Sequence, residues 1–166
     1  QPDFTLDMPA MLAAIERERP AVLFLASPNT PTGARYPSQD VETLIRHADR
    51  HHGAVEVVTK TVEGSIHRYT YRDAHARARK LANALKKLGV QQHDRMATLA
   101  WNTFRHFEIY YAAAGSGAVI HTINPRLFPD QIHYIANHAE DKVVFYDTTF
   151  APLVEKPNLV ALQESM

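Results

Sequence analysis

The chain has 166 residues, enough for one domain with its own core, and it carries 18 basic and 18 acidic side chains. This balance creates no global field that favours nucleic acid or an anionic membrane, so neither is expected as a partner. The sequence contains no cysteine, which excludes disulfides and thiolate metal sites and is compatible with a cytoplasmic location. No apolar run approaches the ~20 residues that a membrane-spanning helix needs.

The N-terminal part predicts two helices with a buried strand between them. A helix is expected at 7–19, with Asp7 as its N-cap. Its inward-facing residues should be Leu12, Ala13 and Ile15. The apolar run 21–26 predicts a strand covered on both faces, the proline-rich segment 27–38 a loop, and 40–53 a second helix. The apolar face of that second helix should comprise Val41, Leu44, Ile45 and Ala48.

The next segment predicts a β-hairpin followed by a long helix. The runs 54–61 and 65–70 flank Glu63-Gly64, a suitable hairpin turn. The helix begins at Thr70 or Asp73 and ends before Gly89. Its apolar residues recur at spacings of four and three and so form one stripe: Ala74, Ala78, Leu81, Leu85 and Leu88. Basic residues lie off the stripe, and a solvated surface is favoured for them over a site for coenzyme A or a partner protein: Arg77, Arg79, Lys80, Lys86 and Lys87.

Strands and helices then alternate with short connections. Strands are expected at 95–100, 118–123 and 142–146, and helices at 104–114 and 129–138. A short helix is expected to continue to residue 154, with one more strand at 159–162. Such alternation is typical of helices packed on a parallel sheet. The fold predicted is therefore layered α/β, a mostly parallel sheet flanked by helices, with one β-hairpin.

Polar residues interrupt the apolar sequence where two of these strands end. Trp101-Asn102 follow one strand, and Asn124-Pro125-Arg126 follow the next. Open α/β sheets bind ligands at the carboxyl ends of their strands. We therefore take Trp101, Asn102, Asn124 and Arg126 as candidate substrate-binding residues. No catalytic set is evident, and no catalytic residue is assigned.

The ten histidines raise the question of a metal site. His47 and His51 stand four residues apart on a helix, a spacing that can place two imidazoles on one ion. No third ligand follows from the sequence, so solvated helix surface is favoured and no metal site is predicted. His121, in an apolar strand, is expected to be a hydrogen-bonded core residue. His133 and His138 are expected on a helix surface or at its end.

Residues 44–155 resemble the N-terminal part of fatty-acyl-CoA synthetases, members of the adenylate-forming ligase superfamily. The carrying segments are HADRHHG (47–53), LANALKKLGV (81–90), DRMATLAWNTFRHFEIYYA (94–112) and GAVIHTINPRLFPDQIHYIANHAEDKVVF (117–145). The resemblance implies a ligase that uses ATP with magnesium and then coenzyme A. It implies that Gly117 lets a helix pass closely onto the sheet and that Asn124-Pro125 fix a turn. It also implies a fatty acyl chain as a partner. Five aromatic residues would then line a tunnel for that chain, whereas packing in the core is the favoured interpretation: Trp101, Phe104, Phe107, Tyr110 and Tyr111.

The sequence departs from this family at the phosphate-binding loop. The family has a Ser/Thr/Gly-rich segment that reads like TSGTTGxPKG, and none of the 166 residues match it. The family's C-terminal lysine, which promotes adenylation, has no counterpart either. Without such groups the developing phosphate charge is not stabilised. The 166-residue chain is therefore expected to be inactive alone.

The segment PDFTLDMPAMLAAIERERPAVLFLASPNTPTG (2–33) carries a second resemblance. Through it, residues 2 to about 50 resemble pyridoxal-phosphate aminotransferases of the histidinol-phosphate type. That family has a PNNPTG-type loop whose second Asn bonds the cofactor. This chain has Thr30 at that place, beside Asn29, so these two residues are the candidate cofactor contacts. The family's aspartate for the pyridine nitrogen is missing from 54–60, and Lys60 is the nearest candidate for a Schiff base.

The chain thus looks like a mosaic of 1–43, 44–155 and a tail at 156–166, with the helix 40–53 as the natural seam. Three hypotheses follow: part of an acyl-CoA synthetase-like ligase, an aminotransferase relative, or a structural chimera without chemistry. A segment cut from a larger domain leaves apolar faces uncovered. Self-association, as a homo-oligomer, is therefore expected.

Overall fold

The structure is a computed structural model that describes residues 7–18 and 38–154. Its elements, in chain order, are α1 (Met8–Glu18), α2 (Ser38–His52), β1 (Glu56–Lys60), β2 (Ile66–Thr70), α3 (Tyr71–Lys87), β3 (Arg95–Leu99), α4 (Phe104–Gly115), β4 (Val119–Thr122), α5 (Pro129–His138), β5 (Val143–Tyr146), a 3-10 turn (Thr148–Phe150) and α6 (Ala151–Val154). The strands expected at 21–26 and 159–162, and most of the loop expected at 27–38, lie outside the described residues.

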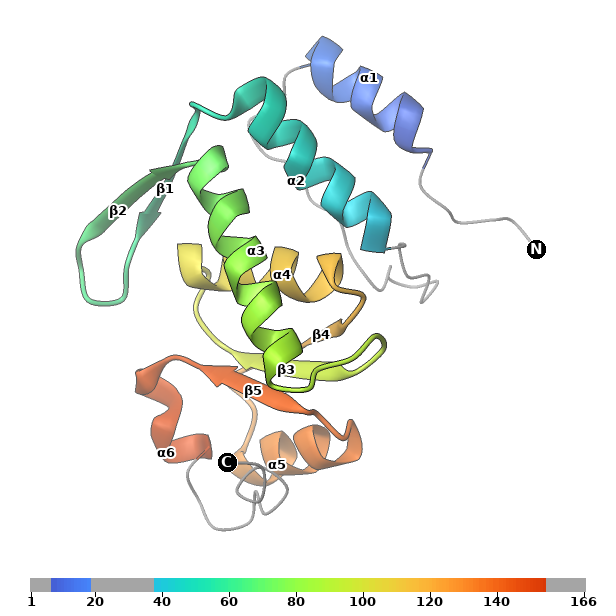
Figure 1. The fold of residues 1–166 in the computed structure, drawn as a ribbon. Coiled ribbons are helices and arrows are strands. Elements are labelled where there is room, and N and C mark those ends of the chain that lie inside the picture. Colours follow the sequence, from blue (N-terminus) through green and yellow to red (C-terminus); the bar gives the residue numbers. More distant parts are fainter. Residues whose placement is uncertain (1–6, 19–37, 155–166) are drawn as a thin grey trace.

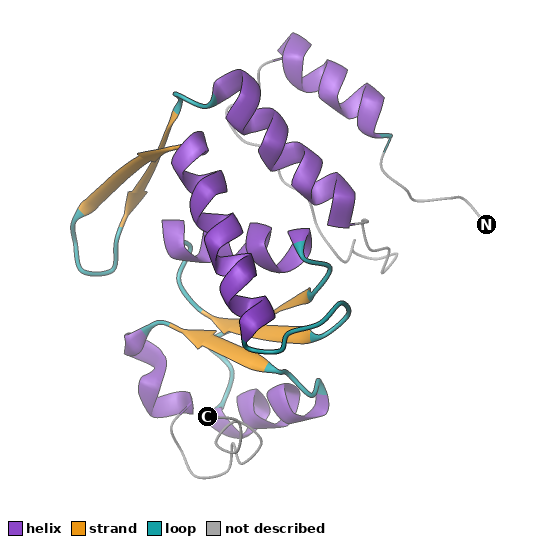
Figure 2. Cartoon of the chain, viewed as in Figure 1, coloured by secondary structure: helices purple, strands orange, loops and turns teal. Residues whose placement is uncertain are grey.

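The central layer is a three-stranded parallel sheet in the order β4-β3-β5. The chain leaves β3 through α4 to reach β4 on one side, and then crosses through α5 to β5 on the other. Because parallel crossovers are right-handed, opposite directions place the two connecting helices on opposite faces. Figure 1 shows this arrangement, with α3 and α4 on one face and α5 and α6 on the other. Figure 2 shows the separate antiparallel hairpin of β1 and β2, so the predicted fold class is confirmed.

The core lies on both faces of β3, whose side chains alternate between them as strand geometry requires. Met96 packs with Leu85 of α3 and Ala112 of α4. Ala97 and Leu99 belong to the cluster on the other face. The remaining buried members of that second cluster are Ile123, Ile132, Ala136 and Phe150. This burial on both faces explains why the strand reads as a nearly continuous apolar run.

Thr70 and Asp73, the two residues predicted as possible starts of α3, both take part in its N-terminal cap. Thr70 is the N-cap, and its hydroxyl oxygen accepts a hydrogen bond from the Asp73 backbone N–H at 3.2 Å. The Asp73 carboxylate accepts in turn from the Thr70 backbone N–H at 3.0 Å. This reciprocal capping box satisfies two N–H groups that the helix leaves free.

The apolar stripe of α3 is buried at Ala74, Ala78 and Leu85 but not at its end. Leu88 is 73% exposed, so its predicted inward position is wrong, because the helix ends at Lys87 and Leu88 is its C-cap residue. Arg77 is exposed, as predicted for the basic face, and its side chain is 52% accessible. Its guanidinium donates a hydrogen bond at 2.7 Å to a carboxylate of α4 that lies in the core.

The two N-terminal helices, α1 and α2, differ in how many of their side chains are buried. In α1, the Asp7 carboxylate accepts from the Ala10 N–H at 3.0 Å, which confirms the predicted cap. This helix has no buried residue, and Ala13, predicted to face inward, is exposed. In α2, by contrast, Leu44 and Ile45 are buried as predicted. None of the helices in the described ranges is long and apolar enough to cross a membrane.

Candidate functional site

Polar residues gather where the three parallel strands end, at one edge of the sheet. Trp101 and Asn102 follow β3, Asn124 and Arg126 follow β4, and 147–149 follow β5. The four side chains that the sequence nominated are all exposed. They therefore stand at the carboxyl edge of a parallel sheet, the position where this architecture binds ligands.

The loops after β3 and β5 are joined at this edge through Trp101. Its backbone N–H donates to the Asp147 carboxylate at 2.7 Å. Its indole N–H donates to the Thr149 hydroxyl at 3.1 Å, and its ring lies 5.1 Å from the ring of Phe150. Sequence reasoning did not include Asp147 and Thr149 among the site residues. Their position in the sequence could have indicated them, because they follow a strand just as 101–102 and 124–126 do.

The loop after β4 forms a compact turn of its own, as predicted. The Asn124 side-chain oxygen accepts a hydrogen bond from the Arg126 backbone N–H at 3.0 Å. The Asn124 carbonyl accepts another from Leu127 at 3.2 Å. Between 101–102 and 124–126, both within the described residues, no hydrogen bond is formed. The edge thus presents one bonded unit around Trp101 and a second, separate turn around Asn124.

A buried histidine lies beneath the first unit. His106 of α4 places its Nε2 atom 3.0 Å from the hydroxyl of Thr98 on β3. Burial lowers the pKa of His106, while the charge of Asp147 and a bond to the Trp101 backbone act in the opposite direction. A neutral, buried imidazole of this kind supports the loop above it. The edge as a whole supplies donors, acceptors and an aromatic surface, which suits binding and positioning.

The aromatic residues considered for an acyl tunnel divide between core and surface. Phe104 is buried and stacks on His67 of the hairpin with ring centroids 3.7 Å apart. Phe107 packs beside the same cluster. Trp101 and Tyr110 are 44% and 41% exposed. For Phe104 and Phe107 the packing interpretation therefore holds.

The remaining histidines follow the sequence-based expectations in part. The Nδ1 atom of His121 lies 2.8 Å from the Asp141 carboxylate, which confirms a hydrogen-bonded residue in that strand. His138 is exposed and stacks on Tyr134. The surface position expected for His133 is wrong. This residue is buried, and its Nε2 atom lies 2.9 Å from the Leu153 carbonyl, because α6 covers that side of α5.

Two further interpretations concern glycine and the pyridoxal-phosphate site. Gly117 does not mark a close pass of a helix onto the sheet. It has φ +80°, and a Cβ there would meet the Gln92 side chain at 2.9 Å. The candidate cofactor contacts Asn29 and Thr30 lie outside the described residues. Lys60 is exposed at the end of β1, paired with Ile66 of β2.

Comparison with protein families identifies the larger part of the chain. The family model described as AMP-binding enzyme matches residues 44–165. The chain belongs to the AMP-binding enzyme family. A second model, aminotransferase class I and II, matches residues 1–58, so the two matched ranges share 44–58. The histidinol-phosphate aminotransferase of Chromobacterium violaceum is 61% identical over 46 residues, which are 28% of this chain and 13% of the relative.

Two similar relatives are named as ligases of coenzyme A. The 3-methylmercaptopropionyl-CoA ligase of Ruegeria lacuscaerulensis is 54% identical over 114 residues, which are 69% of this chain and 21% of the relative. The medium-chain-fatty-acid–CoA ligase of Ectopseudomonas oleovorans has the same identity over the same number of residues, with the same two coverages. This AMP-binding chain therefore spans about a fifth of the length of these curated relatives.

The fold agrees with the family. The inhibitor-bound N-terminal domain of FACL13 from Mycobacterium tuberculosis has a TM-score of 0.65 and 25% identity, with 74% of this chain and 32% of that chain covered. The AMP-binding chain thus corresponds to part of the N-terminal domain of an acyl-CoA ligase. The resemblance read from the segments at 47–53, 81–90, 94–112 and 117–145 is confirmed.

Proposed function

We propose that the chain forms part of the adenylate-forming domain of a ligase that joins a short- or medium-chain carboxylic acid to coenzyme A. The 54% identity to a 3-methylmercaptopropionyl-CoA ligase and to a medium-chain-fatty-acid–CoA ligase carries this proposal. In the reaction, the acid's carboxylate displaces pyrophosphate from ATP, and the thiol of coenzyme A then displaces AMP from the acyl-adenylate. Magnesium would accompany ATP. A cytoplasmic location, testable by cell fractionation, belongs to the same proposal.

The exposed residues of the carboxyl edge would contribute to substrate binding. The amides of Asn102 and Asn124 offer two donors each, and the guanidinium of Arg126 suits a carboxylate or phosphate oxygen. The half-exposed indole of Trp101 offers an apolar face to an acyl chain. This assignment rests on their common place at the strand ends.

The sequence of 166 residues contains no phosphate-binding segment of the TSGTTGxPKG kind. We therefore expect the purified 166-residue chain to show no pyrophosphate exchange with any fatty acid, because the segment that would stabilise the developing phosphate charge in this family is not among these residues. Exchange above background, dependent on both acid and ATP, would contradict this expectation.

A hybrid enzyme tests the proposal directly. Residues 44–154 of this chain would replace the matched segment of the Ectopseudomonas oleovorans ligase. The hybrid is expected to form the acyl-CoA thioester from a medium-chain acid, since the sheet and its edge are supplied in the family's arrangement. The control is the parent ligase, with thermal melts to show that both fold. The proposal would be contradicted if the hybrid folds but forms no thioester while the parent ligase is active.

An aminotransferase-like role is the second candidate, favoured by the match at residues 1–58. Pyridoxal phosphate would then form a Schiff base with a lysine such as Lys60. Addition of the cofactor should change the visible absorbance, and borohydride should fix the adduct to that lysine. Absence of any adduct in peptide mass spectrometry would rule this candidate out. Failure to bind ATP, acid and pyridoxal phosphate, with a cooperative melt, would instead favour a structural chimera.

Self-association is proposed alongside these functions. Large apolar side chains are exposed on the hairpin, namely Val55, Val58, Val62 and Ile66. Exposed apolar surface favours association, and a homo-oligomer would cover these side chains. A clean monomer in light scattering at tens of micromolar, roughly the range of weak association, would count against the proposal.

A further inference from the structure

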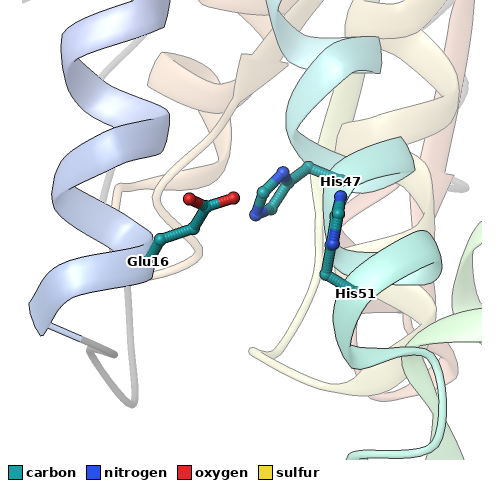
Figure 3. A group of neighbouring side chains, drawn as sticks. All are labelled: Glu16, His47 and His51. Atoms are coloured by element: carbon teal, nitrogen blue, oxygen red, sulfur yellow. The ribbon is translucent and has the colours of Figure 1, made fainter.

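The two N-terminal helices bring three metal-ligating side chains together. Helix α1 lies beside α2 (Figure 1), and Glu16 of α1 points toward His47 and His51 of α2 (Figure 3). One ligand atom from each of the three residues can be chosen so that all lie within 4.8 Å of one another. The spacing of the two histidines is visible in the sequence, but the third residue comes from another helix and could not be inferred from that spacing.

The two histidines stand one helical turn apart and face the same side. Their ring centroids are 4.4 Å apart. The Nε2 atom of His47 is buried and has no hydrogen-bond partner among residues 7–18 and 38–154, the part of the chain that the structure describes. A buried polar atom without a partner costs free energy, and a bound ion would supply the missing contact.

The protonation state of His47 also suits a metal ligand. Burial lowers its pKa, and the neighbouring His51 lowers it further, while Glu16 acts in the opposite direction and His52 adds a smaller lowering. The neutral imidazole is the form that binds metal, because protonation occupies the nitrogen lone pair. Burial beside His51 therefore favours the form of His47 that a metal ion would bind.

We propose that Glu16, His47 and His51 bind one divalent transition-metal ion, with zinc as the reference case and water at the remaining position. Two imidazoles and one carboxylate are a ligand set that zinc accepts. Ligand atoms around a tetrahedral zinc stand about 3.4 Å apart, given bond lengths near ~2.1 Å. Where the separations, all within 4.8 Å, exceed this value, the exposed side chains of Glu16 and His51 permit them to shorten by rotation.

The proposed metal site combines residues from the ranges that the aminotransferase and AMP-binding models match. Glu16 lies where only the aminotransferase model matches, whereas His47 and His51 lie where both models match. Because α1 has no buried residue, apolar burial contributes little to holding it. A metal ion bound between α1 and α2 would therefore fix the position of α1.

The test uses the full chain, purified and stripped of metal with a chelator. Zinc titration by calorimetry should show one binding site per chain and should raise the melting temperature, because the ion binds the folded state preferentially. Glu16→Gln and His51→Gln should each weaken binding roughly tenfold or more, the scale of losses at such sites. Both residues are exposed, so neither change should prevent folding, which circular dichroism would check.

The matched controls keep the same residue types elsewhere. Glu18→Gln alters the next glutamate of α1, which pairs with Arg17, and His138→Gln alters an exposed histidine of α5. Both controls should bind zinc as the unchanged chain does. If Glu16→Gln binds like the unchanged chain while His51→Gln does not, the ion sits on α2 alone and the proposal is overturned. Absence of stoichiometric binding to the unchanged chain would overturn it as well.

Discussion

Arg77 on α3 donates a hydrogen bond at 2.7 Å to the carboxylate of Glu108 on α4, which is only 8% exposed. This bond raises the pKa of Arg77, and Glu108 adds to the effect of burial in raising the pKa of Tyr69. A buried carboxylate needs such a partner, because its charge is otherwise poorly solvated. The pair therefore links the two helices that cover one face of the sheet.

Replacing Arg77 with methionine should leave Glu108 buried without its cation. Loss of one partner of a buried pair costs about 3–5 kcal/mol, and because the Arg77 side chain is 52% exposed we expect roughly 2 kcal/mol here. Urea unfolding would measure this loss. Arg79→Met, an exposed position on the same helix, is the matched control and should change stability little. Equal stabilities of the two variants would show that the pair contributes nothing.

His106 should make the stability of the chain depend on pH below its ordinary pKa of 6.5. Its pKa is lower in the folded state, so the unfolded chain takes up the proton first as the pH falls. The stability contribution is complete above pH 6.5 and declines through the folded-state pKa. His106→Gln should therefore flatten the decline of stability between about pH 6.5 and 5, although His47 retains a similar effect.

Unfolding free energies measured at several pH values would test this prediction. His138→Gln removes an exposed histidine from α5 and should keep the full slope. If His106→Gln has the slope of the unchanged chain, burial of His106 does not control its protonation as inferred. A steeper slope in that variant would contradict the prediction equally.

Local patterns in the sequence predicted the elements well because their causes are local. The cap at Thr70 and Asp73 depends on residues three apart, and the alternation from 95 to 146 depends on apolar periodicity. Such signals are complete within one turn or one strand. For this reason the parallel sheet, the hairpin and the turn at Asn124 were all expected correctly.

The pairs that build the sites could not be predicted in the same way, because they join distant positions. Trp101 and Asp147 are 46 residues apart, and Arg77 and Glu108 are 31 apart. Periodicity shows which face of a helix is buried but not which neighbour meets it. His133 illustrates this limit, since only the later return of the chain through α6 buries it.

Gly117 and Gly89 separate two reasons why a position requires glycine: a positive φ angle and a lack of space for a Cβ atom. Both have positive φ, +80° and +85°, but a Cβ meets a neighbour only at Gly117, where Gln92 lies 2.9 Å away. Gly89→Ala should cost about 1–2 kcal/mol, the cost of that conformation for an L-residue. Gly117→Ala should cost more, and adding Gln92→Ala should recover the difference. Equal costs in thermal melts, without recovery, would place the whole effect in the backbone.

Trp101 is the only tryptophan in the sequence, so its fluorescence reports on the edge of the sheet. Asp147→Ala removes the acceptor of its backbone N–H and should cost about 1 kcal/mol. The loop should then move more freely, with lower anisotropy and emission shifted to longer wavelength. Asp147→Asn keeps a side-chain oxygen and should restore most of both signals, and Asp130→Ala on α5 should leave them unchanged. Emission that is identical in Asp147→Ala and the unchanged chain would mean that Asp147 does not hold the indole, and the edge would lose its support as a prepared binding surface.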